Sequence, residues 1–223
     1  MIGFREDGTI RPSSSITRAA VATIFFRLVT DEFRAQVWST ENDFTDVHQG
    51  QWFNNAVSTM ANANIISGMP DGSFQPNRPI TRGEFAVLVS RFFEFNYVDK
   101  PMFSDVATHW AKNGINMLAN AGLVHGYDDS TFKPDQNISR AEVAALINRA
   151  LMRLPETTED LLFGEMTVWP DNSNPNAWYY LYIQEATNSN EFVLKEDGIH
   201  KKWTAILPAR PWHLLENIYA VPF

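Results

Sequence analysis

The feature that most constrains this chain is that it repeats itself. A turn-like segment begins at Asp7, again at Asp71 and again at Asp129, and the middle copy is Asp-Gly-Ser-Phe-Gln-Pro. A hydroxyl residue followed by arginine comes at the same distance after each copy. Internal repetition indicates that one structural unit is used several times and that neighbouring units bury each other's apolar faces. The hydroxyl–arginine pairs are Thr17-Arg18, Thr81-Arg82 and Ser139-Arg140.

A second segment recurs alongside the first. Phe-x-Asp-Val leads to a tryptophan in residues 44–52 and in residues 103–110, and a weaker copy occupies residues 168–178. The chain therefore consists of a second half, two full repeats and a first half. We expect residues 168–192 to complete residues 4–30, so that three repeats close into a ring with one repeat split between the two ends of the chain.

Both halves of the repeat carry helical patterns. After Thr81, apolar residues recur at the spacing of one helix face, in Phe85, Leu88, Val89 and Phe92. The same stripe follows Thr17 and Ser139. A shorter stripe in each first half has the same spacing. We therefore expect an all-α fold with little or no strand.

The helix starts are marked in the sequence. Thr81 with Glu84, and Ser139 with Glu142, have the spacing of capping boxes. The first copy has Ala20 in place of the glutamate, so its helix start is expected to be weaker.

The repeats divide the chain as follows. Residues 1–43 hold the second half of repeat 1 with a helical linker, 44–102 hold repeat 2 and 103–154 hold repeat 3. Residues 155–167 are acidic and are expected to be a solvated linker, and 168–223 hold the weak first half and a tail that matches no repeat.

Composition excludes several classes of protein. A hydrophobic fraction of 44% provides for a packed core. The chain has no cysteine, which excludes disulfides and thiolate metal sites. A formal charge of −8 with no basic run argues against nucleic acid as a partner. No apolar stretch approaches the roughly 18 residues of a membrane span, and the first residues show no signal peptide, as expected of a piece cut from a longer protein.

The repeated arginines are the first candidates for a site. Each follows a helix N-cap, where a cation opposes the helix dipole. Free backbone N–H groups next to a guanidinium would form a pocket for carboxylate or phosphate. The alternative is that each arginine pairs with a nearby aspartate or with the capping-box glutamate. The three residues are Arg18, Arg82 and Arg140.

Tryptophan and aspartate recur with the arginines. Trp52, Trp110 and Trp178 could stack on sugars if they are exposed, although a tryptophan that anchors two helices is the simpler interpretation. Asp46 and Asp105 are expected to cap the helices that follow, or to hydrogen-bond the arginines, and a direct ligand contact is the minority interpretation.

No catalytic or metal-binding pattern stands out. The histidines lack metal spacing, and residues 128–132 lack the carboxylates of a calcium loop. Nucleotide-binding and hydrolase motifs are absent. We therefore expect no metal and no cofactor, and repetition of one polar set favours binding over catalysis.

At this level of detail the repeats resemble a known family. Residues 103–111, 68–77 and 80–85 carry Phe-Ser-Asp-Val…His-Trp-Ala, Gly-Met-Pro-Asp-Gly-Ser-Phe-Gln-Pro-Asn and Ile-Thr-Arg-Gly-Glu-Phe. These segments are similar to the S-layer homology domain of bacterial surface proteins. The resemblance covers about residues 4–152 and, more loosely, 168–192.

The resemblance implies a fold and a function. Three repeats would form a pseudo-threefold spindle, and grooves between its prongs would bind secondary cell-wall polymer, often through pyruvylated N-acetylmannosamine. The chain would then be a non-catalytic anchor of an extracellular surface protein in the cell wall or S-layer, with other surface-layer proteins as possible partners and without insertion into the membrane.

The resemblance also implies which residues would line the grooves. Position 69 holds methionine where the family usually has an aromatic residue. The last half-repeat lacks the glycine, so the groove that it borders is expected to be non-functional. The implied ligand-binding residues are Arg18, Arg82, Arg140, Thr17, Thr81, Ser139, Trp52, Trp110, Trp178, Asp46, Asp105, Gly68 and Gly126.

Two other functions stay open. A cell-wall glycoside hydrolase would need one unrepeated carboxylate pair, for which the acidic stretch 156–165 is the only unrepeated cluster. A protein-interaction or self-assembly module would use the tail, residues 193–223.

Overall fold

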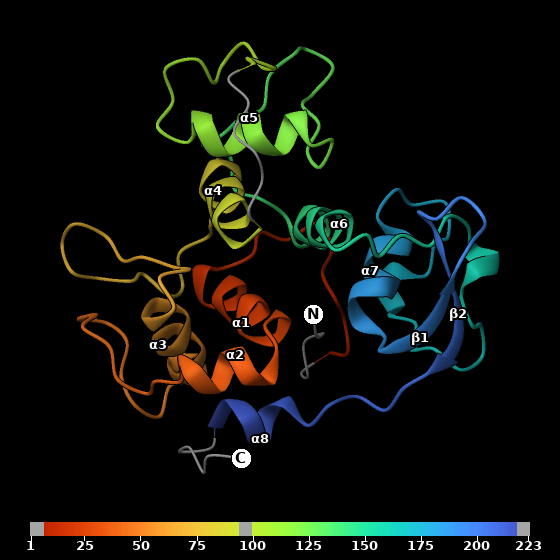
Figure 1. Ribbon diagram of the computed structural model, residues 1–223, viewed down its shortest axis with the longest axis horizontal. Helices are drawn as coiled ribbons and strands as arrows, with labels where there is room; N and C mark the ends of the chain where they lie inside the picture. The colour runs from red at the N-terminus through yellow and green to blue at the C-terminus, as the bar shows by residue number, and fades with distance from the viewer. Residues whose placement is uncertain (1–6, 94–99, 218–223) are drawn as a thin grey trace.

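The structure is a computed structural model that describes residues 7–93 and 100–217. It is mainly helical, which confirms the predicted fold class, with one short antiparallel pair of strands as an addition (Figure 1). No described helix has the length and apolar character that crossing a bilayer requires. The helices are α1 (Arg18–Leu28), α2 (Asp31–Gln36), α3 (Asn54–Asn62), α4 (Arg82–Phe92), α5 (Lys112–Asn120), α6 (Arg140–Ala150), α7 (Tyr180–Thr187) and α8 (Trp212–Asn217), and the strands are β1 (Asn190–Leu194) and β2 (Lys201–Ile206).

The long helices α1, α4 and α6 begin where the sequence predicts. Thr81 accepts the backbone N–H of Glu84 while the Glu84 carboxylate accepts the N–H of Thr81, and Ser139 forms the same capping box with Glu142. Thr17 also caps its helix, without the return bond from a glutamate. Short polar residues at these positions satisfy backbone donors that a helix start otherwise leaves unpaired.

The segments that precede the long helices hydrogen-bond to one another in a closed cycle. The N–H of Ile16 donates to the carbonyl of Ile138 at 3.2 Å, that of Ile138 to Ile80 at 3.0 Å, and that of Ile80 to Ile16 at 3.0 Å. These three isoleucine side chains are 3% exposed or less. We call this cycle the isoleucine ring. It joins the starts of α1, α4 and α6 at the centre of the molecule.

Each long helix packs against the short helix of the half-repeat that follows it in the chain. The pairs are α1 with α3, α4 with α5, and α6 with α7, and they lie side by side in Figure 1. One continuous core of buried apolar side chains runs through the first two pairs, with Phe25, Phe85 and Ile115 fully buried. The apolar stripes predicted from the sequence therefore face a shared core.

An aspartate links the two halves of each repeat. Asp46 accepts the N–H groups of Phe74 and Gln75, and Asp105 accepts those of Phe132 and Lys133. The prediction that Asp46 and Asp105 cap helices or bind arginines is wrong. Neither α3 nor α5 has a side-chain cap, and both carboxylates are occupied by backbone donors.

The same contact joins the two ends of the chain. Asp171 accepts the N–H of Ile10 at 3.0 Å and that of Arg11 at 2.7 Å. Ile10 also packs with Ile183 of α7 in a small buried cluster. The last half-repeat thus contacts the first as the halves of an intact repeat contact each other. The domain boundaries drawn from the sequence stay a prediction.

The acidic stretch and the tail differ from expectation. Residues 155–167 are not simply a solvated linker, because Asp160, Leu161 and Met166 are buried. Leu161 and Met166 pack with Trp203 of β2, which is 1% exposed. The apolar residues of this acidic stretch therefore belong to a small buried core. The acidic composition of the stretch gives no indication of that core.

After the strands, the tail crosses back to the first repeat, where α8 lies beside α2 and α3 (Figure 1). Arg210 donates to both oxygens of Asp31 at 2.8 Å, and Glu216 accepts from Arg27 at 2.5 Å. The guanidinium groups of Arg27 and Arg210 lie over the ring of Trp212. The tail therefore fastens the two ends of the described chain together.

Replacement of Asp171 by alanine tests the join between the chain ends. The Asp171→Ala change leaves the buried Ile10 N–H without its acceptor, and we expect the free energy of unfolding to fall by about 1–3 kcal/mol. Asp105→Ala, which breaks the equivalent contact inside a repeat, should cost a similar amount. Urea unfolding monitored by circular dichroism measures both. Asp128→Ala is the control, because Asp128 is exposed; a loss at Asp171 no larger than the loss at Asp128 would contradict the join.

Candidate functional site

The repeated arginines lie at the first position of each long helix and reach into the next repeat. The Nε–H of Arg18 donates to the carbonyl of Phe74 at 2.7 Å, and that of Arg82 donates to the carbonyl of Phe132 at 2.8 Å. Arg140 closes the cycle by donating to Ile10 at 2.7 Å. All three arginines are 7–8% exposed. The guanidinium groups therefore form a second cyclic set of contacts between repeats, in addition to the isoleucine ring.

Carboxylates of the next repeat accompany two of these arginines. Arg82 donates to Glu142 at 2.5 Å, and Arg18 lies 3.7 Å from Glu84. These are the capping-box glutamates, so the alternative of arginine–glutamate pairing is confirmed for these two positions, with the partner in the following repeat. Burial lowers the pKa of the Arg18 guanidinium, and the nearby Glu84 opposes that shift. The position equivalent to these two glutamates in the first repeat is Ala20, so Arg140 has no capping-box glutamate as a partner.

The backbone amides at the starts of these helices are not free. The N–H groups of Arg82 and Gly83 donate to the carbonyls of Gln136 and Pro134. The corresponding amides of α1 and α6 donate in the same way to the neighbouring link. The expectation of open N–H groups beside each guanidinium is therefore wrong, because the next repeat supplies their acceptors. Whether the arginines also contact a ligand stays a prediction.

The repeated tryptophans are on the surface. Trp52, Trp110 and Trp178 are 55%, 66% and 58% exposed. Each makes a ring contact with the residue beside it in sequence, at centroid distances of 5.3–5.5 Å. The simpler interpretation, in which each tryptophan anchors two helices, is wrong. An indole that remains half exposed in three equivalent places presents an apolar ring face to solvent.

Next to Arg82, aromatic and cationic side chains lie close together. The Arg82 guanidinium lies over the ring of Tyr127 at 5.1 Å, and the ammonium of Lys133 lies 4.0 Å from the same ring. His109, which neighbours Trp110, lies close to Gly83 at the start of α4. We call these residues the second groove, because the sequence resemblance implies a groove at this place.

The second groove has a partly exposed cation that the sequence analysis did not single out. Lys133 keeps 42% of its side chain exposed although it lies 3.6 Å from Asp129. The positions equivalent to Tyr127 and Lys133 in the preceding repeat are Met69 and Gln75. Comparing the repeats at these two positions could have identified the difference between the grooves from the sequence alone.

The two glycines implied by the resemblance have a packing role. A Cβ at Gly68 would lie 2.5 Å from Cε1 of Phe44, and one at Gly126 would lie 2.5 Å from Cε1 of Phe103. Residues with side chains cannot occupy such places without displacing the ring. The hydroxyls of Thr17, Thr81 and Ser139 are likewise engaged as helix caps. Ligand contact by these five residues stays a prediction.

The aspartates of the repeated turns hold their own loops. The carboxylate of Asp71 accepts the N–H and the hydroxyl of Ser73, and Asp129 does the same with Thr131. These hydrogen bonds lower the pKa of both carboxyl groups. The turns therefore need no cation to hold their shape.

One group of possible metal ligands lies away from the grooves. Glu156, Asp197 and His200 have ligand atoms within 4.8 Å of one another at the surface. Glu156 is paired with Lys195 at 2.6 Å, and Asp197 is hydrogen-bonded to His200 at 2.6 Å. Internal partners of the protein thus account for these groups.

Comparison with known proteins identifies the class. Residues 43–86 and 103–144 match the S-layer homology domain. The chain carries S-layer homology domains, as the sequence resemblance implies. Their repeated turn, helix cap and arginine are the elements that build the two cycles at the centre of the fold.

Three relatives show the setting in which such domains occur. The chain is 34% identical over 205 residues to "Cell surface glycoprotein 1" of Acetivibrio thermocellus, covering 86% of this chain and 8% of that protein. It is 33% identical over 197 residues to the "Cellulosome-anchoring protein" of the same organism, covering 86% of this chain and 42% of that protein. It is 33% identical over 150 residues to "Amylopullulanase" of Thermoanaerobacterium thermosulfurigenes, covering 63% of this chain and 8% of that protein. The chain thus spans less than half the length of these relatives.

Alanine at Gly68 separates packing from ligand contact. Gly68→Ala should lower the free energy of unfolding by about 1–3 kcal/mol, because the new methyl group collides with Phe44. The double change Gly68→Ala with Phe44→Leu should recover part of that loss. Gly83→Ala is the control, because alanine stands at the equivalent positions 19 and 141. Thermal unfolding measures all three. Unchanged stability of Gly68→Ala would contradict a packing role.

Proposed function

We propose that this chain is a non-catalytic anchoring module that binds an anionic polysaccharide of the bacterial cell wall in the grooves between its repeats. The observation that carries the proposal is the exposure of Trp52, Trp110 and Trp178 in three equivalent places. Exposing one indole costs hydrophobic free energy that burial would recover. A surface that does so in every repeat presents apolar platforms, and the apolar face of a sugar ring fits such a platform.

The chemistry around the second groove favours an acidic sugar. Lys133 and Arg82 lie on the ring of Tyr127, and the Lys133 ammonium is open to solvent. A carboxylate on the sugar would gain a charge-assisted hydrogen bond there. A pyruvylated N-acetylmannosamine-type unit carries such a carboxylate together with a ring that can rest on Trp110. Arg18 and Arg140 start the helices of the other two grooves, where we propose that they play the same part.

The relatives support this setting. Proteins named for the cell surface and for anchoring share this region, and in the amylopullulanase the shared region is a small part of a long enzyme. A module that recurs in such different proteins supplies attachment, and catalysis belongs elsewhere in the enzyme. We therefore place this chain outside the cell, attached to the wall, with wall polysaccharide as its partner and surface-layer proteins as possible neighbours.

Two of the acidic residues behind the hydrolase alternative are engaged inside the protein. In the acidic stretch, Glu156 pairs with Lys195, and the buried Asp160 accepts the backbone N–H groups of Glu156 and Thr157. A glycosidase needs two carboxyl groups that face one substrate. The internal bonds of this pair support a structural role.

The grooves should differ in strength. The second groove has Tyr127 and Lys133, whereas the first has Met69 and Gln75 in their places. A neutral amide forms a weaker hydrogen bond to a carboxylate than an ammonium does. Several modest grooves on one chain would still give strong attachment to a repeating polymer through avidity.

Removal of the indoles tests the proposal. Trp110→Ala should weaken co-sedimentation with purified wall polymer, and the triple change at Trp52, Trp110 and Trp178 should abolish it. Because these side chains are exposed, the helical circular-dichroism signal should be unchanged. Phe163→Ala removes an equally exposed aromatic ring, 57% exposed and outside the repeats, and serves as the control.

The charge is tested on the same polymer. Lys133→Gln should weaken sedimentation several-fold, and chemical removal of acidic substituents from the polymer should weaken the wild type to the same level. Normal sedimentation of the triple tryptophan variant would contradict the proposal. Alanine at Arg82 is a poor test, because it also breaks contacts between repeats.

A further inference from the structure

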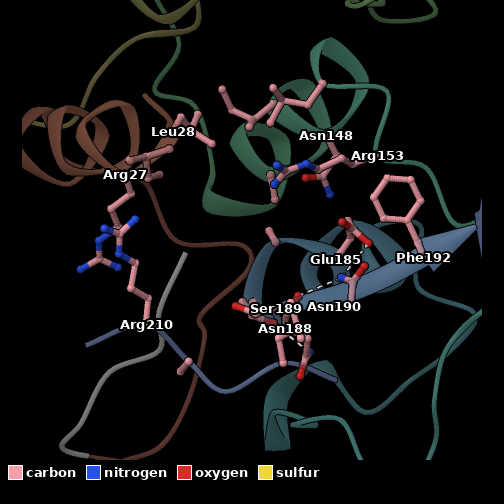
Figure 2. Close-up of a pocket in the computed structure, with 18 of the residues that line it drawn as sticks. Arg27, Leu28, Asn148, Arg153, Glu185, Asn188, Ser189, Asn190, Phe192 and Arg210 are labelled. Atoms are coloured by element: carbon pink, nitrogen blue, oxygen red, sulfur yellow. Dashed lines mark hydrogen bonds between the residues drawn. The ribbon is translucent and has the colours of Figure 1, made fainter. Parts of the chain in front are cut away.

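A cavity of about 380 Å³ lies between α1, α6, α7 and the tail. On α1 it is lined by residues from Ile24 to Leu28, and on α6 by residues from Val143 onward. None of the repeated arginines or tryptophans is among its lining residues. The cavity is therefore distinct from the second groove. Figure 2 shows its walls, with Arg27 and Arg210 on one side and Arg153 on the other.

The cavity is positively charged in an acidic protein. Four cationic residues line it, against a single carboxylate, that of Glu185, whereas the whole chain has a formal charge of −8. Glu185 is already neutralised, because it forms a buried ion pair with Lys201 and also accepts the indole N–H of Trp203 at 2.8 Å. The four cationic residues are Arg27, Arg153, Lys201 and Arg210.

The arginines keep hydrogen-bond donors for a ligand. Glu216 takes the Nε–H of Arg27, and Asp31 takes an Nη2 group of Arg210. Each guanidinium has five N–H donors. Arg153 is exposed, and its charge acts on the buried pair of Glu185 and Lys201. The cavity thus has one exposed guanidinium, which makes no side-chain hydrogen bond within the described residues, facing two that are only partly engaged.

The remaining lining suits a hydroxylated molecule. Asn148 at one wall and Ser189 at the other place an amide and a hydroxyl on the cavity (Figure 2). Phe192 and Trp212 supply aromatic surface. Small-molecule sites combine a few polar groups with apolar walls in a volume of about 300–1,000 Å³, and this cavity falls in that range.

We propose that this cavity binds a monosaccharide-sized anion, either a sugar acid or a sugar phosphate. The Arg153 guanidinium holds the acidic group, the asparagine and serine bind hydroxyls, and an aromatic wall receives the sugar ring. The lining comes from both ends of the chain and from α6 and α7, and none of the repeated arginines or tryptophans takes part in it. The site is therefore additional to the polysaccharide grooves.

Calorimetric titration of the full chain tests the proposal. The probes are glucuronate, glucose 1-phosphate, inorganic phosphate and neutral glucose. At least one of the two anionic sugars should bind with a dissociation constant below about 1 mM. Glucose and inorganic phosphate should each bind at least about tenfold more weakly, since each lacks one half of the recognition.

Two variants locate the site. Arg153→Gln should weaken binding of the anionic sugar about tenfold, as expected from loss of one charged hydrogen bond. Arg91→Gln makes the same change of charge at an exposed position of α4 and should leave binding unchanged. Ser189→Ala should weaken binding by a smaller factor. Circular dichroism verifies that each variant is folded.

The possible outcomes are distinct. The proposal is overturned if neither anionic sugar shows binding at a concentration of about 10 mM, tenfold above the expected dissociation constant. It is also overturned if glucose or inorganic phosphate binds equally well, or if Arg153→Gln binds like the wild type. Arg153→Gln should still sediment with wall polymer, whereas the tryptophan variants should still bind the anionic sugar. Failure of this site and failure of the anchoring function would therefore be seen separately.

Discussion

The isoleucine ring is the interaction on which the rest of the structure depends. Three backbone hydrogen bonds, each from one repeat to the next, hold the starts of α1, α4 and α6 together. Because the cycle is closed, every repeat both donates and accepts one of these bonds. The split repeat takes part through Ile16, and the bonds of Asp171 to Ile10 and Arg11 join its other half to it.

The close contact of the repeats around the ring also determines which groups the repeated arginines bind. Burying a guanidinium is costly unless hydrogen bonds and opposite charge compensate for the lost water. Arg82 donates to the carbonyl of Phe132 and to the carboxylate of Glu142, so its burial is compensated by the neighbouring repeat. The same helix starts that the sequence marks as anion pockets are thus joints between repeats. The repeated tryptophans stay at the surface, and we propose that they are the groups that recognise the ligand.

Much of the fold could be predicted from the sequence because it depends on local signals. The hydroxyl caps of Thr81 and Ser139 and the apolar stripes act within one helix, and the structure places them as predicted. The role of Asp105 was missed, and the glutamate partner of Arg82 was foreseen only as an alternative, for the opposite reason. Their partners are carbonyl, carboxylate and amide groups of another segment of the chain, and local spacing carries no information about such partners.

The candidate site was predictable only in part. The repetition singled out Trp52, Trp110 and Trp178, but exposure is a property of the packed molecule, and the sequence favoured the buried interpretation. The tail was not predictable, because its core pairs Trp203 with Leu161 and Met166 of an acidic stretch whose charge suggested solvent. The cavity between tail and helices follows from that packing.

The central claim is that sugar rings bind on the exposed tryptophans. Indole N–H resonances in a nitrogen-15 correlation spectrum report on each tryptophan separately, and Trp38, which packs on Phe26 and does not line the cavity, provides an internal reference. During titration with a pyruvylated N-acetylmannosamine fragment of wall polymer, the account predicts that the resonances of Trp110, Trp52 and Trp178 shift, Trp110 most, while that of Trp38 stays in place. Saturating fragment that leaves those three resonances unmoved would contradict the account.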